Sequence, residues 1–176
     1  GLTLIVIISI FGPISGAHFN PIVSLVFWLK RMMSFKDFIA YVVMQISGAI
    51  FGCVVANIIF KLPPVTISTL VRHDFSQFLS EILATFGLIL VIFIGSEVSK
   101  QTIPVLVGSY IASAYWFTSS TSFANPAVTV ARQFSDTFTG ISPSGVPTFI
   151  IAQIFGAILG FIVIQFLTNT VIESDY

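Results

Sequence analysis

The sequence predicts an all-α membrane protein, built as an inverted repeat of spanning helices with two re-entrant half-helices. Three observations lead to this fold class. The chain of 176 residues is 56% hydrophobic and 8% charged, whereas a soluble domain carries about 25% charged residues. An Asn-Pro pair occurs twice inside otherwise apolar sequence, and the segments around the two pairs resemble each other.

The composition also argues against several classes of function. So few charged residues cannot cover the surface of a water-soluble fold. The lipid bilayer is therefore the expected solvent for most of the chain. Seven basic and seven acidic residues balance each other, which argues against a nucleic-acid partner. Cys53 is the single cysteine, and His18 and His73 lack the spacing of a metal-ligand pair. We therefore expect no cofactor, no metal and no catalytic residues, and the protein is not expected to be an enzyme.

Long apolar segments mark the expected spans. A helix needs about 20 apolar residues to cross a bilayer. The segments that read as spans are 38–60, 78–95, 103–117 and 148–167. The first apolar run, 1–11, is too short to cross alone. We expect it to be the end of a second helix, with the first helix absent from the sequence.

Two shorter apolar segments begin at the Asn-Pro pairs and are about nine residues long, roughly half a bilayer. Asparagine is a strong helix N-cap, and proline suits the first helical position because its missing N–H is not needed there. Asn20-Pro21 and Asn125-Pro126 therefore predict the starts of two half-helices. Broken helices at membrane depth are tolerated where they line a cavity.

The sequence also resembles itself. "FNPIVS" at 19–24 matches "ANPAVT" at 124–129, and "QISGAIFG" at 45–52 matches "QIFGAILG" at 153–160. The same order and nearly equal offsets indicate a tandem duplication. Three full spans separate the two Asn-Pro pairs, and an odd number of crossings reverses orientation. We expect one domain over 1–176, with a truncated first repeat over 1–60 and a second repeat over 78–170.

Inverted half-helices would bring their N-termini together near the bilayer centre, where such repeats place their sites. Each N-terminus carries about half a positive elementary charge from the helix dipole. Two such ends would repel cations yet offer hydrogen bonds to a neutral hydroxyl-bearing molecule. These features predict a passive channel for water or small uncharged solutes. Two alternatives remain open: a secondary transporter, which can use the same architecture, and a closed structural membrane protein.

At these residues the sequence resembles the aquaporin and glycerol-facilitator family, in its bacterial type. "SGAHFNPIVS" and "FANPAVT" look like that family's paired Asn-Pro-Ala boxes, with Ile22 in place of alanine in the first and Ala127 in the second. "SEILATF" resembles the pattern that opens its fourth helix, placing Glu81 and Thr85. The resemblance implies a multi-pass channel domain in the plasma or inner membrane, assembled as a homotetramer, that passes water or solutes such as glycerol.

The resemblance also locates a selectivity filter. In most family members an arginine directly follows the second box, but this chain has Val128 there. Counting back from Asn125 places two other filter positions at Ser122 and Ser113, and the fourth would precede Gly1. Two serines and a valine make a small, mildly polar, uncharged constriction, which favours neutral solutes larger than water. A bulky fourth residue would instead restore a narrow opening.

Three further residues are expected to brace the loops before the half-helices. Glu81 is the acidic residue inside a span, where a carboxylate is functional or structural. The family pattern implies that it accepts hydrogen bonds from a loop, although a proton relay is an alternative. Thr85 belongs to the same pattern. His18 is expected to brace its own loop rather than bind a metal.

Arg132 lies four residues beyond Val128, so the two side chains share one helical stripe. Its side chain would lean toward the helix N-terminus and therefore toward the constriction. Two interpretations are open for Arg132. It could supply positive potential at the pore mouth, or it could form an ordinary i,i+4 pair with Asp136, which is the interpretation we favour.

Overall fold

The computed structural model describes residues 1–174, with side chains described as far as residue 168, and the regular elements of this part are helices joined by turns and loops. The helices, in chain order, are α1 (Leu2–Ser15), α2 (Pro21–Leu29), α3 (Phe35–Ile59), α4 (Phe75–Val98), a 3₁₀ turn η1 (Lys100–Thr102), α5 (Ile103–Phe117), α6 (Pro126–Arg132) and α7 (Val146–Ser174). Three of them, α3, α4 and α7, are long and apolar enough to cross a membrane. The chain is therefore a membrane protein, as its composition predicts.

The half-helices α2 and α6 begin at the predicted prolines. The starts of α3 and α4 each lie three residues earlier than predicted. The Ser34 hydroxyl accepts a hydrogen bond from Asp37 N at 3.1 Å, and an Asp74 carboxylate oxygen accepts one from Gln77 N at 2.8 Å. These polar N-caps extend each helix beyond its apolar segment.

Several helix ends also differ from the prediction, and the ends of α1 and α6 have a local cause. The first helix, α1, continues through Pro13 to Ser15 and ends at Gly16, whose φ is 75°. A left-handed glycine is a common way to end a helix because it carries no Cβ. The second half-helix ends at Arg132, two residues before the end of the apolar segment. Both differences reflect local backbone geometry that a hydropathy pattern does not contain.

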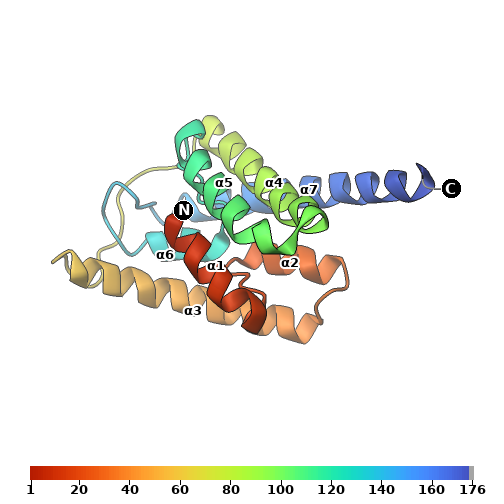
Figure 1. Ribbon diagram of the computed structural model, residues 1–176. Helices are drawn as coiled ribbons and strands as arrows, with labels where there is room; N and C mark the ends of the chain where they lie inside the picture. Colours follow the sequence, from red (N-terminus) through yellow and green to blue (C-terminus); the bar gives the residue numbers. More distant parts are fainter. Residues whose placement is uncertain (175–176) are drawn as a thin grey trace.

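The two half-helices run in opposite directions from a meeting point in the middle of the bundle (Figure 1). The long helices α3 and α7 also run opposite to each other, as do α1 and α5 (Figure 1). Helix α4 packs along α7, α1 along α5, and α3 along α6. This is the arrangement of an inverted repeat, with one half-helix entering from each side.

The contact between α4 and α7 depends on two glycines. A Cβ added at Gly156 would collide with the Ile82 carbonyl oxygen of α4, and one added at Gly160 would lie 2.9 Å from Ile89 Cγ2. The corresponding glycines of α3, Gly48 and Gly52, have nothing within 4 Å. The two repeats therefore differ in packing: α7 is covered by α4, whereas this side of α3 is open.

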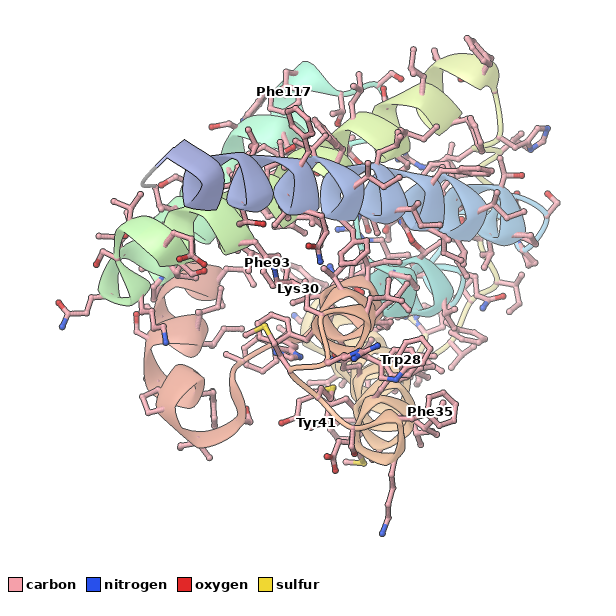
Figure 2. The ribbon with its side chains drawn as sticks, turned by 90° about the vertical axis from the view of Figure 1, so that its right-hand side faces the viewer. Trp28, Lys30, Phe35, Tyr41, Phe93 and Phe117 are labelled. Carbon is pink, nitrogen blue, oxygen red and sulfur yellow. The ribbon has the colours of Figure 1, made fainter. Side chains whose placement is uncertain are left out.

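Aromatic contacts hold the C-terminal end of α2. The Trp28 ring centroid lies 5.4 Å from that of Phe35 and 5.6 Å from that of Phe38, both in the first turn of α3. Lys30 Nζ lies 5.4 Å from the centroid of the Phe93 ring of α4. Figure 2 shows Trp28 beside Phe35 at the end of the bundle. These contacts tie the C-terminal end of the half-helix to two long helices, α3 and α4.

Candidate functional site

The two half-helices are capped in the same way. Asn20 Oδ1 accepts a hydrogen bond from Ile22 N at 3.0 Å. Asn125 Oδ1 accepts bonds from Ala127 N at 2.9 Å and Val128 N at 3.4 Å. In both cases the following proline is the first helical residue. The cap oxygens therefore satisfy backbone donors that a helix start leaves free.

Each asparagine also holds the loop that leads into the other half-helix. Asn20 Nδ2 donates to Ala124 O at 2.7 Å, and Asn125 Nδ2 donates to Phe19 O at 2.9 Å. These reciprocal bonds keep the two N-termini side by side. An amide nitrogen carries two N–H groups, so one N–H on each asparagine is left for a further acceptor.

The two loops share an uncommon backbone geometry. Ala17 and Phe19 in the first loop have φ values of 48° and 44°, and Ser122 and Ala124 in the second have 48° and 45°. A left-handed conformation is uncommon for residues other than glycine and costs free energy. It occurs at equivalent positions of both repeats, where the carbonyls of Phe19 and Ala124 meet the asparagine amides.

Glu81 of α4 is fully buried and holds the second loop. Its Oε1 accepts hydrogen bonds from Ser120 Oγ at 2.6 Å and Phe123 N at 2.8 Å. Its Oε2 accepts bonds from Ala124 N at 2.8 Å and Gln153 Nε2 at 2.7 Å. Four donors from a loop and a neighbouring helix therefore converge on one carboxylate.

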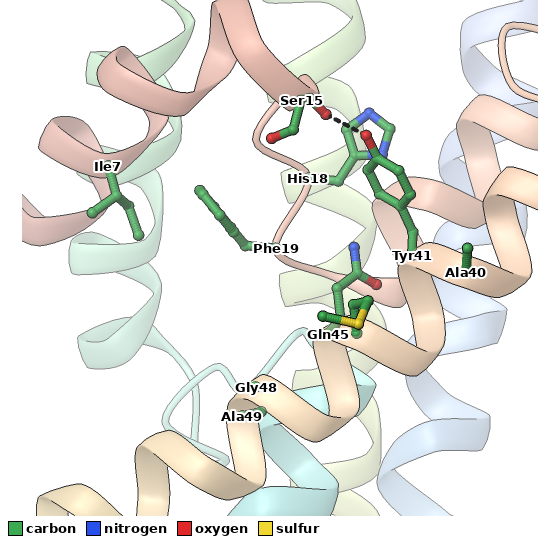
Figure 3. A pocket seen from close by; sticks show the side chains of 10 residues that line it. Ile7, Ser15, His18, Phe19, Ala40, Tyr41, Gln45, Gly48 and Ala49 are labelled. Atoms are coloured by element: carbon green, nitrogen blue, oxygen red, sulfur yellow. Dashed lines mark hydrogen bonds between the residues drawn. The ribbon is translucent and has the colours of Figure 1, made fainter.

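His18 lies in the first loop, between α1 and α2. Its Nδ1 is 3.1 Å from Ser24 Oγ, and its ring centroid is 4.2 Å from that of Phe27 and 5.5 Å from that of Tyr41. Beside it lies a groove of about 590 Å³ between α1, this loop and α3. Figure 3 shows this groove and the bond from Tyr41 Oη to Ser15 O at 2.8 Å.

Thr85, the third residue expected to brace a loop, is fully buried in α4. Its hydroxyl is buried and has no hydrogen-bond partner among the described residues. Its Cβ instead lies 3.0 Å from the place that a Cβ would take at Gly156. Thr85 therefore contributes to the close packing of α4 on α7, where its small size matters more than its hydroxyl.

The three expected filter residues differ from one another in exposure and in contacts. Val128 is half-buried and packs against the apolar cluster of Phe123, Ile141 and Phe149. Ser122 is 7% exposed, and its hydroxyl has no partner among the described residues. Ser113 of α5 is exposed, and its hydroxyl donates to Ser109 O at 2.9 Å. No hydrogen bond between described residues joins Ser113, Ser122 and Val128 to one another.

The alternative pairing of Arg132 with Asp136 is wrong. The Asp136 carboxylate accepts hydrogen bonds from Thr69 N at 2.9 Å and Thr69 Oγ1 at 3.1 Å. Arg132 instead lies over the Phe123 ring, with its Cζ 4.2 Å from the ring centroid. The i,i+4 argument fails because α6 ends at Arg132, so Asp136 is not on the next helical turn.

Comparison with known proteins identifies the family. The sequence profile of the family described as Major intrinsic protein matches residues 1–122. The chain belongs to the major intrinsic protein family. Members of this family are channels rather than enzymes. The predicted family and fold class are therefore confirmed.

Similar proteins carry aquaporin names. The chain is 48% identical over 167 residues to "Aquaglyceroporin AqpS" of Rhizobium meliloti, which covers 95% of the chain and 72% of that protein. It is 29% identical over 147 residues to "Aquaporin-4" of Homo sapiens, covering 76% of the chain and 44% of that protein. It is 31% identical over 124 residues to "Aquaporin NIP1-2" of Arabidopsis thaliana, covering 64% of the chain and 41% of that protein.

Sequence reasoning missed two residues near the second box of this family member. Phe123 supports Arg132 and donates its N–H to Glu81. Arg72, from the loop before α4, is 7% exposed and donates to three backbone carbonyls, those of Gly140 at 2.8 Å, Ser120 at 3.2 Å and Phe138 at 2.8 Å. A single sequence does not pair Arg72 with a loop about 50 residues or more away, because no local spacing encodes that contact.

Proposed function

We propose that this protein is a passive membrane channel for water and small uncharged solutes such as glycerol. The reciprocal bonds of Asn20 and Asn125 carry this proposal, because they hold two helix N-termini together with one amide N–H left on each asparagine. The names of the similar aquaporins and of the aquaglyceroporin support the same function.

The mechanism follows from hydrogen-bond donors and dipoles. Each half-helix points its positive end toward the meeting point, so a cation faces two repulsive dipoles. A water or alcohol oxygen accepts hydrogen bonds from the free N–H groups and so offsets the loss of its hydration. Neutral molecules would therefore cross the narrow region, whereas cations would be rejected.

Ser113, Ser122 and Val128 are proposed to line the constriction. The Ser122 hydroxyl is buried and has no partner within the described residues, so it would bond a passing solute once its side chain turns toward the path. Val128 contributes neither the charge nor the bulk of an arginine. An uncharged constriction of small side chains fits a solute larger than water.

The remaining residues are proposed to position the pore. Glu81 and His18 hold the loops before the half-helices, and Thr85 keeps α4 close to α7. We propose that residues 1–176 act as one channel domain in the plasma or inner membrane, with the homotetramer of the family as the assembly. Glu81 already accepts four hydrogen bonds, which supports a channel over an ion-coupled transporter.

Stopped-flow light scattering on proteoliposomes holding the full-length protein tests this function. We expect water and glycerol permeabilities well above those of empty liposomes, with a glycerol flux linear in the gradient. Saturation of the flux at moderate glycerol concentration, or its dependence on a pH gradient, would favour the transporter. The absence of both fluxes in a folded protein would favour the closed structural protein.

A further inference from the structure

The uncharged residue Val128 raises the question of where a fixed positive charge lies on the pore. Half-helix dipoles carry only partial charges, and a full cation is a stronger barrier to other cations. Two arginines lie close to the second loop, Arg132 at the end of α6 and Arg72 from the loop before α4. Both contact Phe123, which adjoins the expected filter residue Ser122.

The Phe123 ring is shared by the two guanidinium groups. Arg132 Cζ lies 4.2 Å from its centroid, and Arg72 Cζ lies 5.4 Å from it. The ring is 3% exposed and packs edge-on against Phe149 at 5.1 Å. Since Glu81 also holds the Phe123 N–H at 2.8 Å, the ring is a fixed platform. A cation over an aromatic face is stabilised there.

Glu81 is the carboxylate that attracts both guanidinium groups, and its single negative charge leaves the pair of arginines with a net positive charge. Neither arginine forms an ion pair with an Asp or Glu within the described residues. Arg72 is satisfied by three backbone carbonyls, which keep its full charge in place. Arg132 Nη1 is buried without a hydrogen-bond partner. The nearest expected acid, Asp136, is bound to Thr69 instead.

We propose that Arg72 and Arg132, held on Phe123, form a positive barrier just outside the constriction and exclude cations where the filter has no arginine. This inference rests on the proposed channel function. Arg132 is one helical turn beyond Val128, about 6 Å along the axis. Charge selection is therefore separated from size selection: the constriction stays wide and uncharged, and the arginine pair repels cations from the outer mouth.

The test compares sodium leak with neutral flux in the same proteoliposomes of full-length protein. In Arg132→Gln we expect the sodium leak to rise about tenfold, because a unit charge acts strongly across a few ångströms of low dielectric. Water and glycerol permeabilities should stay within about twofold of the natural values. Arg132→Lys keeps the charge and should keep the leak low. Arg31→Gln, an exposed arginine after α2, is the matched control and should change nothing.

Three results would overturn the inference. The first is a sodium leak in Arg132→Gln equal to that of the natural protein while neutral flux persists. The second is an equal leak in Arg132→Lys and Arg132→Gln, which would assign the effect to shape. If Arg132→Gln does not fold, Arg132→Met replaces it, because methionine packs on the ring without charge and should show the raised sodium leak. The third refuting result is a sodium leak in Arg132→Met as low as that of the natural protein. If the natural protein passes neither water nor glycerol, the channel function itself is refuted.

Discussion

Glu81→Gln is the change that most directly tests how the second loop is held. The carboxylate accepts four hydrogen bonds, two at each oxygen. An amide keeps one oxygen, but its nitrogen is a donor and does not accept. Two donors therefore lose their acceptor, whichever way the amide is oriented.

The cost can be worked from these contacts. Glu81 is fully buried, so the two orphaned donors find no water. Leaving a buried donor without an acceptor costs about 1–3 kcal/mol. We expect Glu81→Gln to lose about 2–6 kcal/mol of folding stability and to loosen the segment Ser120–Ala124.

Thermal unfolding of the purified protein in detergent, together with water flux in liposomes, measures both effects. We expect a clear drop in Tm and a reduced flux per folded protein. Glu97→Gln is the matched control, because Glu97 is exposed near the end of the same helix. A Glu81→Gln protein with the Tm and flux of the Glu97→Gln control would refute the role assigned to this carboxylate.

Three other changes have definite expected outcomes. Val128→Arg adds bulk and charge to the constriction, so glycerol permeability should fall at least about tenfold more than water permeability; equal losses would contradict the filter position. Gly156→Ala places a Cβ against the Ile82 carbonyl, so a loss of about 1–3 kcal/mol is expected from thermal unfolding, and an unchanged Tm would count against close packing. Asn20→Ser keeps a cap oxygen but loses the bond to Ala124 O, so water permeability should fall while the protein still folds; unchanged flux would contradict the amide's role.

The sequence predicted those parts of the fold that depend on local chemistry. The starts of α2 and α6 follow from Asn-Pro pairs, because capping needs only the asparagine and the next few residues. The starts of α3 and α4 were placed too late, since a hydropathy pattern ignores caps such as Ser34 and Asp74. The apolar pattern therefore predicts that a helix is present, whereas the position of its first, polar turn depends on the capping residue.

The site was less predictable where contacts cross the chain. The position of Glu81 in a span pointed to a bound carboxylate, but its four donors come from segments that only folding brings together. The assumed pairing of Arg132 failed because a helix end cannot be read from charge spacing. Arg72 and Phe123 gave no local signal, and their contact with Arg132 is a tertiary one.

Thiol labelling of Val128→Cys in a Cys53→Ser background tests most directly whether solutes pass between the half-helices. A methanethiosulfonate reagent attaches a bulky group to an accessible thiolate, and water flux is measured before and after labelling. Phe138→Cys, at an exposed loop position of 77% accessibility, is the matched control for labelling outside the path. We predict that labelling at position 128 blocks water flux and that labelling at position 138 does not. Full water flux through a protein shown to be labelled at position 128 would mean that the path lies elsewhere.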